Sequence, residues 1–456
     1  MNTGDIMELD FSLKTREIIV HGLNGKYFDA CVIGGGIAGA GIFNLLSANG
    51  ISTLLVDKGD FASGTSSYSS KLIHGGIRYL QQGHILLTRE LLRERNYLVK
   101  NTNFVEEKEF NILIDNYSWN PMTIRFGLFL YEIIGGKLRI PKMYRDKYSY
   151  KGFKGYFTYT DAVSDDAYLT ISNIVSGAMN GSKAINYAEV TEINDKEANQ
   201  VEVKILDKVS GTSGKAICKI VINATGPWVN ETLKMYTGKK ISNLKLSKGS
   251  HVIVENKGYI KNPIAFKSHI DGRQMFIIPR DETLIIGTTD KFVDSPNEFS
   301  IDDEDRDYIF RSAKRIIPDL KEEDILRGYA GIRPLYGRGN SPGRVTRDFH
   351  IEIDRRMVSI MGVKITNYRN AARHSAKYIE RLLGRKIYTK GLPQILYQRN
   401  SPGTIETLLD QVIRYEMPLY TEDIIKRRLG LFFFKKDGGE SLKSLIDEKL
   451  REYRSK

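Results

Sequence analysis

The chain has little cysteine and no long apolar run. Only two of its 456 residues are cysteines, Cys31 and Cys218, and each lies in an apolar run typical of a buried strand. This placement argues against a disulfide framework, and neither cysteine has a second cysteine or a histidine at metal-ligand spacing. No stretch approaches the roughly 18 apolar residues of a membrane span, and the start lacks the basic and apolar regions of a signal peptide. We therefore expect a cytoplasmic protein without a metal or iron–sulfur site.

The charge balance is basic, with 68 Lys and Arg residues and a formal net charge of +13. The cations are scattered and interspersed with acids, which is typical of a solvated surface. Two sharper interpretations stay open, namely attraction to anionic phosphate substrates and attraction to the negative inner face of a membrane. Nucleic-acid binding has no recognition motif behind it, so we do not expect it.

A glycine motif predicts a dinucleotide site near the start of the chain. Gly34, Gly36 and Gly39 stand at G-x-G-x-x-G spacing after the apolar run Ala30–Ile33. The first glycine permits a tight turn, the second lets the backbone approach a pyrophosphate, and the third lets the following helix pack on the sheet. A second apolar run ends in Asp57, where an acid can accept hydrogen bonds from ribose hydroxyls. This spacing does not choose between FAD and NAD.

A second segment selects a family. Phe61–Ser67 is rich in hydroxyls and small residues, which suits a loop around pyrophosphate and ribityl oxygens. Ser69–Tyr79 then reads S-S-K-L-I-H-G-G-I-R-Y. Here the chain resembles the FAD-dependent glycerol-3-phosphate dehydrogenase family. The resemblance runs from about Phe28 to Arg385, through motifs in the expected order: Tyr159–Asp161, Asp165–Ala167, Asn223–Val229, Lys248–His251, Ile277–Pro279, Ile286–Asp290, Gly331–Leu335, Ser341–Pro342, Thr346–Asp348 and Lys364–Arg369.

The resemblance implies an α/β fold in which a Rossmann-type FAD domain, like that of glutathione reductase and D-amino-acid oxidase, is interleaved with an antiparallel-sheet substrate domain. We predict a discontinuous FAD domain at 28–101, 158–243 and 336–385 and a substrate domain at 102–157 and 244–335. Residues 386–456 form a shortened helical C-terminal cap. The role of the residues up to about Tyr27 is not revealed by the sequence.

Periodicity and turn residues place the main elements. Helices are expected at 86–99, 122–134, 167–180, 303–317, 367–383, 408–416, 420–429 and 442–453, and strands at 184–190, 200–206, 216–223, 251–254, 275–278, 284–286 and 358–361. Asp165 and Asp166 are interpreted as the amino-terminal cap of the third helix rather than as catalytic acids.

The resemblance and the glycine motif together give the cofactor site. The predicted FAD-binding residues are Gly34, Gly36, Ile37, Ala38, Gly39, Asp57, Lys58, Ser63, Thr65, Ser66, Ser69, Ser70, Lys71, Val190, Ala224, Gly226, Gly362, Ile365 and Thr366. Relatives usually have two glycines where this chain has Gly362 and Val363, and threonine is common at the position of Asn367. Val363 would be strained if it had to adopt a positive φ, whereas an extended conformation would cost little.

Oxidation of glycerol 3-phosphate at C2 needs cations for the phosphate, an acceptor for the hydroxyl proton and a carbon held against flavin N5. The resemblance implies Arg78, Tyr79 and Arg347 at the phosphate, with Arg333 and Lys364 at the hydroxyl end and the reduced flavin. His251 is the candidate proton acceptor, because the ordinary pKa of histidine lies near neutrality. The alternative for His251 is a histidine hydrogen-bonded under the sheet. His74 is expected to pack near the flavin ring.

Two regions depart from relatives. Residues 110–116 replace a proline-containing strand, which puts local substrate-domain contacts in doubt, and the C-terminal cap is short. With a reduced cap we expect weak intrinsic membrane affinity and docking through a separate anchor protein. Leu431–Phe434 followed by two lysines is either a membrane-insertion patch or, as we favour, part of the cap core.

The function predicted from the sequence is FAD-dependent oxidation of sn-glycerol 3-phosphate to dihydroxyacetone phosphate, with electrons passed to a quinone-linked acceptor at the inner face of the cell membrane. The alternatives are an oxidase of the same family that uses oxygen, a non-catalytic flavin-binding phosphate sensor, and an amine oxidase of the same fold. A homodimer is expected only because relatives are often dimers.

Overall fold

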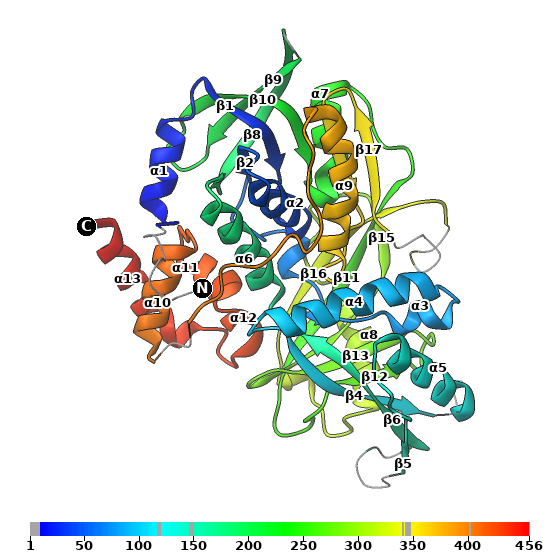
Figure 1. Cartoon of the computed structure of the whole chain (residues 1–456). Coiled ribbons are helices and arrows are strands. Elements are labelled where there is room, and N and C mark those ends of the chain that lie inside the picture. The colour runs from blue at the N-terminus through cyan, green and yellow to red at the C-terminus, as the bar shows by residue number, and fades with distance from the viewer. Residues whose placement is uncertain are drawn as a thin grey trace.

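The computed structural model describes residues 10–115, 120–145, 150, 152–197, 199–339, 342, 348–400 and 403–455. Two sheets and a C-terminal group of helices make up the molecule (Figure 1). The helices are α1 (Leu13–His21), α2 (Ile37–Ala48), α3 (Ile77–Gln81), α4 (Ile85–Asn101), α5 (Pro121–Ile134), α6 (Asp166–Met179), α7 (Val229–Thr237), α8 (Asp303–Lys314), α9 (Tyr368–Leu383), α10 (Ile405–Tyr415), α11 (Thr421–Asp423), α12 (Leu431–Phe434) and α13 (Lys443–Ser455). None of the helices in these ranges is long and apolar enough to cross a membrane.

The first sheet, sheet A, carries the glycine motif. Its strands run in the order β17 (His350–Asp354), β18 (Met357–Met361), β10 (Ser213–Asn223), β1 (Lys26–Ile33), β2 (Thr53–Val56) and β7 (Lys183–Ile185), with β8 (Ala188–Lys196) and β9 (Gln200–Asp207) attached through β10. The strands from β18 to β7 are parallel, as the apolar runs of β1 and β10 require when helices cover both faces. Helices α2, α6 and α9 share one core beside this sheet (Figure 1).

The second sheet, sheet B, is built from strands that lie between Leu72 and Tyr336 in the sequence. Its strands run in the order β15 (Lys291–Val293), β11 (Leu244–Glu255), β14 (Thr283–Gly287), β13 (Gln274–Pro279), β12 (Ile264–Lys267), β4 (Glu106–Ile114), β6 (Gly155–Val163) and β3 (Leu72–Ile73), with β16 (Ile325–Tyr336) on β11 and β5 (Met143–Tyr144) on β6. Most pairs are antiparallel, and β12 with β4 is parallel.

Two segments that were expected in the cofactor domain pair in sheet B. The whole of β6 pairs in sheet B, so the predicted start of a cofactor segment at residue 158 cuts through a strand of the other sheet. Strand β3, which the prediction also gave to the cofactor domain, pairs with β6 as well. The expected strand 184–190 is interrupted, because β7 ends at Ile185 and β8 begins at Ala188. Tyr187 between them has φ +50°, which breaks the extended backbone.

The segment before β1 and the C-terminal helices are both tied to the cofactor half. Arg16 of α1 is buried, and its Nε donates to the Asn186 carbonyl at 3.0 Å. Helices α10 to α13 have a small core of their own that includes Leu409, Val412 and Ile446. Leu431 packs in this core, which confirms the interpretation as cap core for that residue, whereas Phe433 is buried in the core of sheet B. Within the described residues of the leader, α1 is therefore a packed structural element.

Candidate active site

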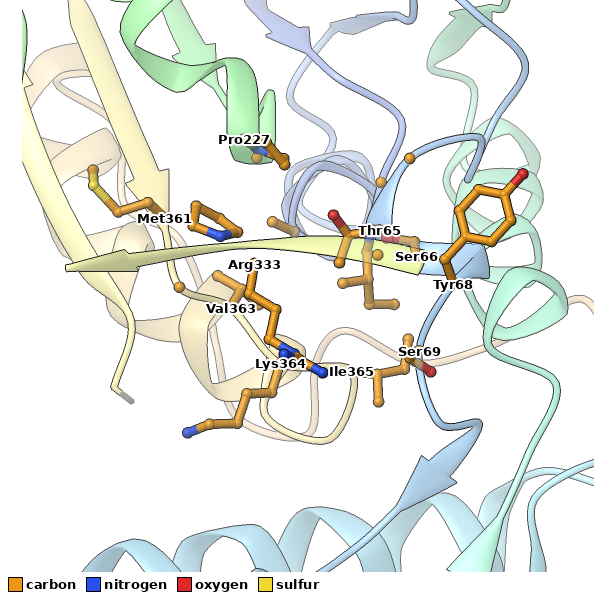
Figure 2. Close-up of a pocket in the computed structure, with 18 of the residues that line it drawn as sticks. Thr65, Ser66, Tyr68, Ser69, Pro227, Arg333, Met361, Val363, Lys364 and Ile365 are labelled. Atoms are coloured by element: carbon orange, nitrogen blue, oxygen red, sulfur yellow. The ribbon is translucent and has the colours of Figure 1, made fainter. Parts of the chain in front are cut away.

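A cavity of about 800 Å³ lies between the two sheets. Its walls include the turn after β1, many of residues 57–79, the start of β8, the turn after β10, part of strand β16 and residues 360–366. Figure 2 shows Arg333 of β16 beside Lys364 and Ile365, with Ser69 and Tyr68 across from them. The cavity therefore gathers segments that lie between Ile33 and Thr366 in the sequence.

The cofactor half of the cavity is built by the turn from β1 to α2. Gly34 has φ +104°, and a Cβ there would lie 2.6 Å from the Ala224 carbonyl oxygen, so only glycine fits. A Cβ on Gly39 would lie 1.9 Å from the Gly34 carbonyl oxygen, which is the close helix–strand packing expected for the third glycine. The amino end of α2 consequently points into the cavity, where its N–H groups favour an anion.

Most of the residues predicted to bind the cofactor line this cavity. They are Gly34, Gly36, Ile37, Ala38, Asp57, Lys58, Ser63, Thr65, Ser66, Ser69, Ser70, Val190, Ala224, Gly226, Gly362, Ile365 and Thr366. Gly362 takes the positive φ of +74°, and Val363 does not, so the substitution that departs from relatives carries no backbone strain of this kind.

Lys71 is a correction to the predicted site. Its side chain is buried outside the cavity wall, forms an ion pair with Asp166 and donates to the Ser67 carbonyl at 3.1 Å. Its ammonium also lies 3.8 Å from the centre of the Phe433 ring. Lys71, whose backbone is left-handed (φ +54°), therefore joins α6 to the C-terminal helices.

The predicted substrate cations converge in the other half of the cavity. Arg78 and Tyr79 of α3, Arg333 of β16 and Lys364 all line it, whereas Arg347 lies outside the described residues. The Lys364 ammonium is buried without a hydrogen-bond partner among the described residues, 4.9 Å from the centre of the Tyr79 ring. A buried ammonium in this position favours an anionic ligand.

The two candidate histidines differ in their access to the cavity. His251 is buried behind the wall, where its Nε2 lies 2.8 Å from Ser70 Oγ and its ring stacks on Tyr329. Burial, together with the cations Arg333 and Lys71, lowers the pKa of His251 to about 3. His74 is partly exposed and lines the cavity itself. The prediction that His251 meets the substrate is therefore corrected, and the alternative of a histidine hydrogen-bonded under the sheet fits its environment.

Comparison with known proteins shows which family this chain resembles in sequence and in structure. The sequence profile of the family described as FAD dependent oxidoreductase matches residues 29–362. The aerobic glycerol-3-phosphate dehydrogenase of Staphylococcus haemolyticus is 34% identical over 380 residues, which cover 79% of this chain and 68% of that protein. This chain belongs to the FAD-dependent glycerol-3-phosphate dehydrogenase family. The protein of the same name from Staphylococcus aureus strain USA300 is 33% identical over 387 residues, 81% of this chain and 70% of that one.

Solved structures agree with the family. The glycerol-3-phosphate dehydrogenase of Bacillus halodurans, solved in complex with FAD, has a TM-score of 0.76 and 26% identity, covering 97% of this chain and 94% of that one. The L-α-glycerophosphate oxidase of Mycoplasma pneumoniae, at 20% identity and a TM-score of 0.63, shares the fold over 83% of this chain and 100% of that one. The fold class predicted from the sequence is confirmed.

The cavity of this flavoenzyme fits the cofactor of its family. The glycine turn leaves backbone space for a pyrophosphate, and Ser66 Oγ accepts from the Ile37 amide at 2.9 Å at the same helix end. Asp57 lines the cavity at the end of β2, where its Oδ2 accepts from the Gly35 amide at 2.6 Å and its Oδ1 from the Gly59 amide at 2.8 Å. Two backbone donors thus fix the carboxylate beside the place where a ribose is expected.

Asp57 gives a pH-dependent prediction for cofactor binding. Burial raises the pKa of Asp57 to about 6, although the amides of Gly59 and Gly35 oppose the rise. Ribose hydroxyls donate to the ionised form, so the apoprotein is expected to lose FAD affinity as pH falls below about 6, by up to about tenfold per pH unit. Titration of apoprotein with FAD between pH 5 and pH 8, followed by flavin fluorescence, measures this. The Asp57→Asn variant should bind more weakly and lack this slope; a slope equal to that of the wild type would remove Asp57 as its cause.

The sequence did not predict a role for several residues that line the cavity. Asp161 lines the wall, and its Oδ1 accepts from the Gly75 amide at 3.0 Å while its Oδ2 accepts from the Tyr131 hydroxyl at 2.9 Å. It therefore holds the turn between His74 and α3, and burial raises its pKa to about 6. The motif Tyr159–Asp161 was visible in the sequence without a role. The signal that could have assigned one is the two-residue period of a strand, which puts Tyr159 and Asp161 on the same face of β6.

An aromatic pair closes the cavity beside the cofactor half. Trp228 stacks on Phe299 with ring centres 5.7 Å apart, and the Lys58 ammonium lies 4.3 Å from the centre of the Trp228 ring. All three residues line the cavity. Because Phe299 belongs to a loop of the sheet B half, no local pattern could have paired it with Trp228.

Proposed function

We propose that this protein oxidises sn-glycerol 3-phosphate to dihydroxyacetone phosphate, with FAD held along the glycine turn as the hydride acceptor. The observation that carries the proposal is the placement of Arg78, Arg333 and the Lys364 ammonium in the same cavity as the dinucleotide turn. A phosphate dianion compensates such cations, whereas an amino acid substrate needs fewer. Relatives named glycerol-3-phosphate dehydrogenase support this choice of substrate.

Each residue has a separate part in the proposed reaction. Arg78 and Tyr79 bind the phosphate, together with Arg347. Arg333 and Lys364 hold the C1 and C2 end and favour negative charge as the carbonyl forms. When bound, FAD supplies the two-electron chemistry that takes the hydrogen of C2 as hydride. The protein's contribution is orientation, because C2 must lie in line with the flavin while the phosphate is held at a distance.

The hydroxyl proton needs an acceptor in the cavity wall. His74 lines the cavity, whereas His251 reaches it only through Ser70. The low pKa of His251 keeps its ring neutral and makes it a weak base at neutral pH. We therefore infer that His74 accepts the proton and that His251 positions Ser70 in the cofactor wall.

The electron acceptor is proposed to be quinone-linked, with the protein attached peripherally to the inner face of the cell membrane. A separate anchor protein and a homodimer remain the expectations from relatives. The rival proposal is an oxidase that passes electrons to oxygen. Hydrogen peroxide formed in step with substrate consumption in air would favour that rival.

Anaerobic titration of the bound flavin tests the function. Glycerol 3-phosphate is expected to bleach the oxidised flavin absorbance, while glycerol and a set of amino acids at the same concentration leave it unchanged. The His74→Gln variant should be reduced about 10²-fold more slowly, and His251→Gln within about tenfold of the wild-type rate. Failure of glycerol 3-phosphate to reduce wild-type flavin would favour the phosphate sensor, and reduction by amino acids would favour an amine oxidase.

A further inference from the structure

One face of α5 exposes large apolar side chains in a regular stripe. Met122 and Phe126 are 69% and 62% exposed, four residues apart, and Ile133 continues the stripe two turns later. The segment that follows α5 extends this surface with Leu138, which is 94% exposed, and with Ile140. These five residues are called the α5 face below.

The exposure of the α5 face is not a consequence of a poorly packed helix. The opposite side of α5 packs Leu128 and Tyr131 into the core of sheet B, and Glu132 accepts there from the Thr160 amide at 2.9 Å. The helix therefore has one apolar side for the core and another for its surroundings. A surface helix normally carries polar residues on its outer side, so a second apolar side indicates a binding surface.

Cations predominate in the segment that forms the α5 face, although two of them are paired with acids of β4. Between residues 120 and 145 the cations are Arg125, Lys137, Arg139, Lys142 and Arg145, and the single acid of this range, Glu132, is buried. Lys137 and Arg139 form ion pairs with Glu107 and Glu109 of β4. Apolar side chains bordered by cations are the composition of a surface that inserts shallowly into a bilayer containing anionic lipid.

The α5 face adjoins the substrate half of the cavity. Helix α5 contacts both α3 and α4, and α3 carries the cavity residues Arg78 and Tyr79. In Figure 1 α3, the start of α4 and α5 gather at one edge of the molecule, and at that start Leu86 is 81% exposed. A surface bound at the α5 face would consequently lie next to the half of the cavity where the proposed substrate is oxidised.

We propose that the α5 face binds an anionic lipid bilayer directly, with Phe126 and Leu138 at the boundary between headgroups and acyl chains. The inference deepens the proposed membrane attachment and replaces the expected anchor protein with a surface of this chain. Leu431–Phe434 is not available for this role, since Leu431 and Phe433 are buried. A second copy of this chain is a poorer partner for the α5 face, because a two-fold contact would bring the cations of both copies close to one another.

Vesicle flotation of the FAD-loaded full chain tests the proposal. Binding is expected to vesicles of phosphatidylcholine with about one third phosphatidylglycerol, to weaken in high salt, and to be slight with phosphatidylcholine alone. The Phe126→Glu/Leu138→Glu double variant should lower the partition coefficient by about tenfold or more, because glutamates oppose both apolar insertion and the anionic surface. Both side chains are exposed, so flavin content and melting temperature should stay at wild-type values.

A matched control places the same charge elsewhere. Leu396 is 48% exposed on a segment away from α5, and Leu396→Glu should float like the wild type. Absence of wild-type binding, or equal binding by the α5 double variant, would overturn the proposal. Self-association that only the double variant abolishes, without lipid, would assign the face to a second copy instead. Flotation uses no substrate, so its failure leaves the flavin titration, and the function it tests, unaffected.

Discussion

The Arg333→Ala variant is expected to lose about 10³-fold in kcat/KM for glycerol 3-phosphate. Arg333 lines the cavity from β16, and its Nη2 donates to Thr288 Oγ1 at 3.2 Å while Nη1 lies 3.4 Å from Asp290 Oδ1. Loss of a positioned charge at the hydroxyl end removes stabilisation as the carbonyl forms, which is typically worth about 10²- to 10³-fold, and leaves Asp290 without one of its cations. Steady-state assays with an artificial electron acceptor measure the loss.

The controls separate binding chemistry from folding. Arg273 approaches the same carboxylate from outside the cavity wall, with Nη1 at 3.4 Å from Asp290 Oδ2, so Arg273→Ala should keep kcat/KM within about tenfold. Arg333→Lys keeps the charge without the planar fork and should recover part of the loss. Flavin content should be unchanged in all three variants. Equal losses of kcat/KM in the Arg333→Ala and Arg273→Ala variants would mean that both act through Asp290 and that Arg333 does not contact the substrate directly.

The Asp60→Asn variant is expected to lose about 3 to 5 kcal/mol of stability, which is typical when one partner of a buried ion pair is removed. Asp60 follows Asp57 by three residues and is buried. Its carboxylate accepts from Arg427 at 2.6 Å and from Arg428 at 2.8 Å. Asn186 donates to the same carboxylate at 2.8 Å. Without Asp60 two buried guanidinium groups lose their shared counter-charge, so the C-terminal helices should detach first. A lower melting temperature and faster limited proteolysis of residues beyond about 400 measure this.

The effect of Asp60 has a defined pH dependence. Burial alone would raise its pKa, but Arg428 and Arg427 lower the pKa to about 2. A carboxyl whose pKa is lowered by folding contributes stability above its unfolded pKa of about 4 and loses it as pH falls towards 2. The gap in melting temperature between wild type and Asp60→Asn should therefore be full at pH 7 and shrink below pH 4. Asp410→Asn, which removes an exposed partner of Lys449, should shift the melting temperature little at any pH.

The cofactor turn was predictable because its chemistry is local. Gly34, Gly36 and Gly39 act within one strand–turn–helix unit, so spacing alone sets their roles. Lys71 was mispredicted because its partners, Asp166 and Phe433, come from remote segments, and an ion pair across the fold leaves no trace in local spacing. The choice between the two alternatives for His251 stayed open for a related reason. The strand that carries His251 was predicted, but the burial of its side chain behind Ser70 depends on how β11 packs against the loop that contains Ser70.

The amino-acid sequence by itself determined the family, the FAD-type fold, the dinucleotide turn and the cations Arg78, Arg333 and Lys364 that line the cavity. The turn depends on residue type and spacing within one strand–turn–helix unit, whereas the family, the fold and the cations follow from a resemblance of motifs spread along the chain. The tertiary structure alone decided which histidine faces the cavity, that Lys71 and Asp60 join the C-terminal helices to the cofactor half, and that α5 keeps an apolar side exposed. Burial of a side chain depends on which other elements cover it, and that is a property of packing between segments far apart in sequence.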